Sequence, residues 1–185
     1  MEQWLSGAAL TTINMQKKPI ISLAQAQQLA KKYGTPLYIY RKKIIKRRYN
    51  DLNSAIRYPR KKIYFACKAN SNSEILEFLR GLGSSVETVS PGEIAKALKA
   101  GFKPKDISFT CSNISHQELI SVARKKVHVH IDSLNQLAWW GKAKLGRNVS
   151  LRLNAGFGSG HHSHVITGGP SSKFGIWKGD LSEAI

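Results

Sequence analysis

The sequence has few residues of several kinds, and each shortage excludes a class of protein. Of its 185 residues only 2 are cysteine, too few for a disulfide scaffold or a four-cysteine metal site. It has no run of about 18 apolar residues, which excludes an ordinary membrane-spanning helix. The opening MEQWLSGAAL lacks the basic stretch and long apolar segment of a secretory signal. We therefore expect a cytoplasmic protein in a reducing environment.

Acidic residues are scarce as well. The 11 Asp and Glu are outnumbered by 29 Lys and Arg, which gives a formal net charge of +18. The densest basic stretch, from Arg41 to Lys62, suggests a nucleic-acid-binding module, because Lys and Arg neutralise phosphates. Apolar residues recur within it at spacings of three and four, from Ile44 to Ile56, which instead predicts a helix with a solvated basic face. We prefer the solvated face and do not expect nucleic acid as a partner, with the binding module kept as the alternative.

Enough apolar material is present for a packed core, since 42% of the residues are hydrophobic and 9% aromatic. Apolar periodicity and capping residues predict helices over 23–32, 42–57, 72–82, 91–100, 116–125 and 133–142, with the first turns of another over 179–185. Short apolar runs predict strands over 62–67, 85–89, 107–110, 127–131 and 149–154. The strand starts recur about every 20–23 residues, the length of a β-α unit.

This alternation predicts an α/β fold with a parallel sheet. Alternate strand residues are apolar, from Ile63 to Leu153, and suit packing against helices. The opposite face is polar and runs from Tyr64 to Asn154. In a parallel barrel such polar residues point inward, and those at strand ends line the mouth. We predict an incomplete (β/α)8 TIM-type barrel, because only five strands are visible, with an open doubly wound sheet as the alternative. The chain would then be the front portion of a larger enzyme.

Lys68 is the first candidate for chemistry. It stands in IYFACKAN at the carboxyl end of a predicted strand. Apolar neighbours would lower the pKa of its amine and make it nucleophilic, and the small Ala66 would leave room for a planar group. The plainer interpretation is a lysine in water at the end of a strand.

Four blocks in order resemble a known family. They are PLYIYRKKIIKRRYNDL, IYFACKANSNSEILEFLRGLG, VETVSPGEIAKALKAGF and HHSHVITGGPSSKFGI. Together they are similar to diaminopimelate decarboxylases, pyridoxal-phosphate enzymes whose barrel is of the alanine-racemase type. The resemblance runs from Gly34 to Ile176. It implies a pyridoxal-phosphate-binding barrel, of which residues 41–185 are the N-terminal part. Residues 1–40 would pack with a β-rich second domain.

The resemblance also implies roles for particular residues. Lys68 would bind pyridoxal phosphate covalently, and Glu87 and Arg152 would complete the cofactor site. Glu87 stands where relatives usually have Asp. Without the resemblance, it would be an acid paired with a basic neighbour such as Arg152. His130 stands where relatives carry a small polar residue, and we expect it to have a packing role.

Three further histidines, His161, His162 and His164, have a spacing that suggests zinc only weakly, and no acidic or Cys ligand lies beside them. We therefore expect no metal site.

The resemblance implies decarboxylation of meso-diaminopimelate to L-lysine and carbon dioxide, in lysine biosynthesis. Ornithine, arginine or carboxynorspermidine as the amino-acid substrate would be the alternative within the same chemistry. The resemblance further implies that the full-length form is a homodimer. The later glycine-rich phosphate-binding stretch of the family is absent from the sequence. We therefore expect this chain by itself to be inactive.

Overall fold

The computed structural model describes residues 20–159 and 166–184. The chain falls into two compact units, Met1–Ile44 and Ile45–Ile185. Helix α1 (Leu23–Tyr33) belongs to the first unit. Helix α2 (Lys42–Ala55) begins in the first unit and continues into the second, which contains the sheets. Within the described ranges, no helix is both long enough and apolar enough to cross a bilayer.

The ends of the first two helices follow from local chemistry. Ser22 caps α1 by accepting a hydrogen bond from the Gln25 amide, and the Gln25 side chain accepts one from Ser22 in return. Helix α2 ends at Ala55, two residues earlier than the predicted Arg57. The Lys61 ammonium donates to the carbonyl of Ile56 at 2.6 Å, which satisfies one of the carbonyls at the end of the helix.

The apolar stripe predicted on α2 packs only in part. Ile44, Ile45 and Tyr49 are half-buried. Leu52 is 49% exposed and Ile56 38% exposed, so the stripe loses its cover toward the end of the helix.

Strands and helices then alternate as predicted. The elements are β1 (Tyr64–Ala66), α3 (Ser73–Gly81), β2 (Ser85–Thr88), α4 (Pro91–Lys99), β3 (Ile107–Thr110), α5 (His116–Arg124), β4 (His128–Ile131), α6 (Leu134–Lys142) and β5 (Ser150–Leu151). Each helix from α3 to α6 begins after a residue whose side chain accepts a hydrogen bond from a first-turn amide: Asn72, Ser90, Ser115 and Ser133. The capping residues therefore set where each helix starts.

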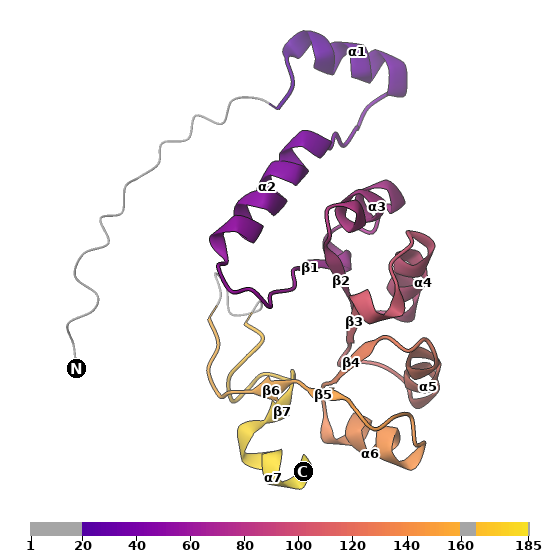
Figure 1. Ribbon diagram of the computed structural model, residues 1–185, viewed down its shortest axis with the longest axis vertical. Helices are drawn as coiled ribbons and strands as arrows, with labels where there is room; N and C mark the ends of the chain where they lie inside the picture. Colours follow the sequence, from indigo (N-terminus) through magenta and orange to yellow (C-terminus); the bar gives the residue numbers. More distant parts are fainter. Residues whose placement is uncertain (1–19, 160–165, 185) are drawn as a thin grey trace, which may run out of the picture. The chain divides into compact units, whose positions relative to one another are not determined.

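The strands form one parallel sheet in the order β1-β2-β3-β4-β5, which is also their order in the chain. Helices α3 to α6 lie along one side of it (Figure 1). A doubly wound sheet reverses its strand order and carries helices on both faces, so this alternative is wrong. The predicted α/β architecture, part of a β/α barrel, is confirmed.

The core lies between the sheet and these helices. Its fully buried side chains include Leu76, Val86, Ile94, Ile107, Phe109, Leu119, Val122 and Ile131. They come from alternate strand positions and from the apolar stripes of α3, α4 and α5. This is the face that the sequence predicted to pack against helices.

The last predicted strand is wrong in one respect. Residues 149–154 form two short strands, β5 and β6 (Leu153–Asn154), with Arg152 between them. The Arg152 amide donates to the carbonyl of Ile131 in β4, while the Arg152 carbonyl accepts from the amide of Ile176, both at 2.8 Å. At Arg152 the chain therefore changes partner, from β4 to β7 (Ile176–Trp177), a strand that the sequence did not predict.

This change of partner reverses which residues are buried. Leu153, predicted to pack against helices, is 51% exposed, whereas Asn154, predicted on the polar face, is 4% exposed. The Asn154 side chain bonds the backbone of Gly169 through both of its polar atoms, at 2.9 and 3.0 Å. Asn154 thereby ties the loop before β7 to β6.

After β7, the chain forms a 3-10 turn (Lys178–Asp180) and the short helix α7 (Leu181–Ala184). The predicted helix start in this region is confirmed.

The position of the core predicts that the buried ring of Phe109 contributes to stability. We expect Phe109→Ala to lower the free energy of unfolding by about 3–5 kcal/mol, because the 1% exposed ring leaves a cavity. Phe157→Ala is the matched control, since that ring is 80% exposed. Urea denaturation followed by circular dichroism measures both. Equal losses for the two variants would contradict the position of the core.

Candidate functional site

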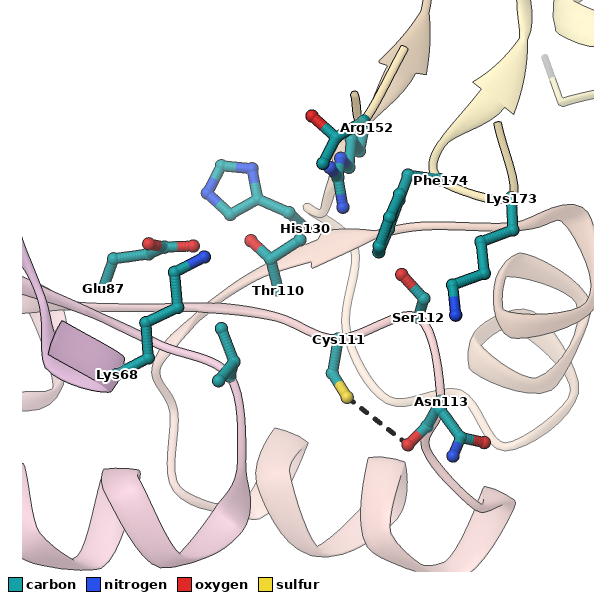
Figure 2. Close-up of a pocket in the computed structure, with 12 residues that line it drawn as sticks. Lys68, Glu87, Thr110, Cys111, Ser112, Asn113, His130, Arg152, Lys173 and Phe174 are labelled. Atoms are coloured by element: carbon teal, nitrogen blue, oxygen red, sulfur yellow. Dashed lines mark hydrogen bonds between the residues drawn. The ribbon is translucent and has the colours of Figure 1, made fainter. Parts of the chain in front are cut away.

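A cavity of about 580 Å³ lies at the carboxyl end of the parallel sheet, where the ends of β1 to β4 meet. Its walls are formed by Lys68, Glu87, Val89, Thr110, Cys111, Ser112, Asn113, His130, Arg152, Thr167, Lys173 and Phe174. Figure 2 shows these side chains converging from separate strand ends. The three residues predicted from the sequence, Lys68, Glu87 and Arg152, all line this one cavity. Loops at this end of a parallel sheet are the usual place for a ligand site.

Lys68 lies just beyond β1, two residues after Ala66, where the strand ends. Residues Cys67–Ala69 form a 3-10 turn, closed by a hydrogen bond from the Asn70 amide to the Cys67 carbonyl at 3.1 Å. Cys67 is fully buried and anchors the turn in the core, which leaves Lys68 exposed and extended into the cavity. The apolar surroundings expected around its amine are therefore not supplied by this part of the chain.

Glu87 is the third residue of β2 and is half-buried. The sheet register pairs it with Ala66 in β1 and with Ser108 in β3. Its carboxylate points toward the Lys68 amine (Figure 2). The register thus gives the cavity a carboxylate next to its lysine.

Arg152 has a different acidic partner from the one considered in the sequence. Its guanidinium forms an ion pair with Asp132 at 2.8 Å, and Asp132 is 2% exposed. The suggested pairing of Glu87 with Arg152 is therefore wrong. Asp132 directly follows β4 and Arg152 directly follows β5. Because β4 and β5 are neighbours in the sheet, these two residues meet. A buried carboxylate needs such a partner, and this pair fixes the arginine at the cavity wall.

Phe174 and Lys173 line the cavity from the loop before β7, and the sequence did not single them out individually. The Arg152 guanidinium lies 4.8 Å from the centre of the Phe174 ring, a cation-π contact. Gly175 follows with φ +80, and a Cβ there would lie 3.0 Å from the Arg152 carbonyl oxygen. Only glycine allows this close approach, which brings Phe174 beside Arg152. The SKFGI block of the sequence contains these two residues. It gives no sign that they lie beside Arg152, which is more than 20 residues earlier in the chain.

The loop after β3 forms another wall through Cys111, Ser112 and Asn113. It is held by Gln136, a 3% exposed residue of α6, whose amide nitrogen donates to the Cys111 carbonyl at 2.8 Å. The Gln136 carbonyl oxygen accepts from the Asp132 amide at 3.0 Å. Gln136 therefore links the loop after β3 to the acid that holds Arg152. The sequence gave no signal of this role, because Gln136 lies inside a predicted helix.

His130 lines the cavity from β4. Burial lowers the pKa of its imidazole below 6.5, and the nearby His128 lowers that pKa further. The two rings meet edge to face with centroids 4.8 Å apart, and His128 is bonded to Ser150 at 2.8 Å. A neutral imidazole at the cavity wall is the consequence near pH 7.

The remaining histidine candidates, His161, His162 and His164, lie outside the described residues. Among the residues that the structure describes, no three His, Cys, Asp or Glu side chains are grouped to hold a metal ion.

The comparisons bear on what this cavity holds. A family model described as pyridoxal-dependent decarboxylase, pyridoxal binding domain, matches residues 42–185. The chain belongs to this family. The match includes every residue that lines the cavity, and the pyridoxal-dependent decarboxylases are lyases whose cofactor is pyridoxal phosphate.

Several relatives of this decarboxylase domain are named diaminopimelate decarboxylase. The diaminopimelate decarboxylase of Methanothermobacter thermautotrophicus is 40% identical over 167 residues, which cover 89% of this chain and 39% of the relative. That of Escherichia coli K12 is 38% identical over 162 residues, covering 85% of this chain and 37% of the relative. This chain therefore spans about two fifths of the length of such relatives.

Solved structures agree with the sequence relatives. A diaminopimelate decarboxylase matches with a TM-score of 0.80 at 35% identity, over 92% of this chain and 40% of that one. The enzyme from Helicobacter pylori in complex with L-lysine matches with a TM-score of 0.77 at 30% identity, over 86% and 42%. A lysine/ornithine decarboxylase from Vibrio vulnificus, at 18% identity and a TM-score of 0.71, shares the fold.

The cavity of this pyridoxal-dependent decarboxylase domain fits pyridoxal phosphate by its chemistry. The cofactor carries an aldehyde, a phosphate and an aromatic ring. The cavity offers a primary amine in Lys68, cations in Arg152 and Lys173, and an aromatic ring in Phe174. Its volume lies in the range of about 300–1,000 Å³ usual for cofactor sites.

The ion pair predicts an effect on stability. We expect Arg152→Met to lower the free energy of unfolding by about 3 kcal/mol, because the Asp132 carboxylate would be left buried without its cation. The double variant Asp132→Asn, Arg152→Met should recover part of this loss. Urea denaturation measures both, with Arg124→Met on the exposed end of α5 as control. An Arg152→Met loss no larger than the control would contradict the pair.

His130 predicts a dependence of stability on pH. Because folding lowers the pKa of His130, the unfolded chain takes up the proton first as the pH falls through 6.5. Stability is thus unaffected above that value and decreases below it, levelling off under the folded-state pKa. The melting temperature should fall more between about pH 7.5 and 5.5 than it does in His130→Gln. His116→Gln, an exposed histidine, is the control and should behave like the unaltered protein. Identical pH profiles for all three proteins would refute the prediction.

Proposed function

We propose that this chain is the lysine-bearing part of a diaminopimelate decarboxylase, which converts meso-diaminopimelate to L-lysine and carbon dioxide. The observation that carries the proposal is the convergence of Lys68, Glu87 and Arg152 on one cavity within a pyridoxal-binding family domain. The names of the relatives support the choice of substrate. Those relatives are more than twice as long, so the activity of the whole protein is part of the proposal.

Lys68 is the proposed attachment point of the cofactor. Its amine is the nucleophile that the cavity presents, and the 3-10 turn holds it at the end of β1. Glu87 lies beside it and balances positive charge near the amine. The Glu87 carboxylate can also accept a proton that leaves Lys68 and return it.

Arg152 is the proposed orienting cation. Its ion pair with Asp132 and its contact with Phe174 fix the guanidinium before any ligand binds. A fixed donor fork binds an oxygen anion without losing side-chain freedom at that moment. Pyridoxal phosphate, when bound, supplies an aldehyde for amines and a ring that takes up the electron pair left by departing carbon dioxide.

The proposed substrate rests on the names of the relatives. Ornithine, arginine or carboxynorspermidine remains the second candidate within this chemistry, and the shared fold of the lysine/ornithine decarboxylase is compatible with it. Side-by-side assays with meso-diaminopimelate and ornithine distinguish them.

Three further properties belong to the proposal. Residues 1–40 would pack with a β-rich second domain, and the full-length form would be a homodimer. The two cysteines, Cys67 and Cys111, are both free, which suits the cytoplasm. Size-exclusion chromatography with light scattering tests the dimer.

The attachment point is tested by chemical trapping. After incubation with pyridoxal phosphate and reduction with borohydride, peptide mass spectrometry should find the pyridoxyl group mainly on Lys68. Lys68→Arg should remove that label, while Lys96→Arg, a lysine outside the cavity lining, should leave it unchanged. Labelling spread evenly over the exposed lysines would contradict the assignment.

Activity is a separate measurement. We expect the 185-residue chain alone to release no carbon dioxide from meso-diaminopimelate, because the Lys68 amine is exposed and the chain spans only about two fifths of the length of its decarboxylase relatives. Lysine formation by this chain, abolished in Lys68→Ala, would overturn the expected inactivity and would support the assignment of Lys68.

A further inference from the structure

The amino end of the sheet, opposite the candidate site, is strongly basic. Because β1 to β5 are parallel, the five segments that lead into them meet at this end: 56–63, 82–84, 100–106, 125–127 and 143–149. Four of these segments carry exposed Lys or Arg, such as Lys125 and Lys126 before β4. The segment 82–84 has no Lys or Arg, but Arg80, in the last turn of α3, adds a cation beside it. The single carboxylate in the five segments is Asp106.

A second cavity, of about 290 Å³, opens at this basic end beside β1, β2 and β3. Four cations line it, Lys62, Arg80, Lys103 and Lys105, together with the lone Asp106. Cations brought together around a concave surface repel one another unless an anion lies between them. The lining therefore has the charge of an anion site.

Arg80 is oriented at this cavity by the backbone. Its Nε donates to the Ala100 carbonyl at 2.9 Å, which fixes the plane of the guanidinium. Gly101 follows with φ +85, and a Cβ there would lie 3.1 Å from Arg80 Nε. A glycine at this position thus leaves the space in which the guanidinium lies.

Lys62 is held in a similar way. Its ammonium donates to the Lys105 carbonyl at 2.9 Å and pairs with Asp106 at 3.1 Å. Burial works to lower the pKa of Lys62, but the hydrogen bond to Asp106 and the nearby Tyr64 raise it above its usual value. Asp106 is thereby occupied by Lys62, and the neighbouring Lys103 and Lys105 keep their charge uncompensated in the described segments.

We propose that the amino end of the sheet binds the phosphodiester backbone of a single-stranded nucleic acid, with one phosphate in the Arg80–Lys103–Lys105 cavity. An arginine with two lysines provides several donors for the oxygens of one phosphate. The remaining cations follow the ends of adjacent strands, about 4.8 Å apart, along a twisted sheet. A flexible single strand can follow such a line of charges, whereas a duplex is stiff over this length.

The proposed surface shares residues 56–62 with the basic stretch noted in the sequence, Arg41 to Lys62, but it does not include the helical part of that stretch. That stretch includes Arg47 and Arg48, which belong to α2 and do not line the cavity. The two regions can therefore be tested against each other with equal changes in charge.

Fluorescence anisotropy with a labelled oligouridylate, titrated at several salt concentrations, tests the proposal on the full chain. We expect binding by the unaltered protein and weaker binding by the double variant Lys103→Gln, Lys105→Gln. Because both lysines contact the same phosphate, removing them should reduce the slope of log K against log salt by about 0.7. The matched control Arg47→Gln, Arg48→Gln removes the same charge and should leave the slope nearly unchanged. Circular dichroism verifies that all four substitutions leave the fold intact.

Three results would overturn the proposal. The first is no binding of the oligouridylate near physiological salt. The second is an equal loss in both double variants, which would mean that binding follows net charge alone. The third is full displacement by inorganic phosphate or equal affinity for polyglutamate, which would assign the cavity to a free phosphate or the surface to an acidic protein.

Discussion

The parallel pairing of β1 to β5 is the constraint on which the rest of this structure depends. After each strand the chain must return to the opposite end of the sheet before the next parallel strand can begin. A helix therefore connects each strand to the next. The helices bury the apolar face, and the loops that follow the strands all gather at the carboxyl end. The residues of the candidate site are far apart in the chain and become neighbours only for this reason. The same pairing collects the basic segments at the amino end.

Arg152 is the second point on which the site depends. Its backbone ends the pairing with β4 and begins the contact with β7, while its side chain pairs with Asp132 and lies over Phe174. One residue thus joins the five-stranded sheet to the two-stranded one and places a cation at the cavity wall. Gln136 supports this arrangement from behind, because it bonds both the Asp132 amide and the loop after β3.

The two ends of the sheet differ in how their charges are arranged. At the carboxyl end, Lys68, Arg152 and Lys173 line the cavity together with Glu87, and the arginine has a buried partner. At the amino end, four cations share the single Asp106. A paired arrangement positions side chains for chemistry, whereas an unpaired surplus attracts anions over a longer range.

The sequence by itself determined the helices, the strands and the class of fold, because capping residues and apolar periodicity are local properties. It also pointed to Lys68, Glu87 and Arg152 through a family resemblance, and the structure brings these three together. It did not predict β7, the exposure of Leu153 or the pairing of Arg152 with Asp132. Those features depend on which segments meet across the fold. A hydrogen bond from Ile176 to Arg152 joins residues 24 apart in sequence, and no periodicity within either segment records it. Tertiary packing alone decided them, because backbone partners and buried charge pairs are chosen by what lies alongside in space.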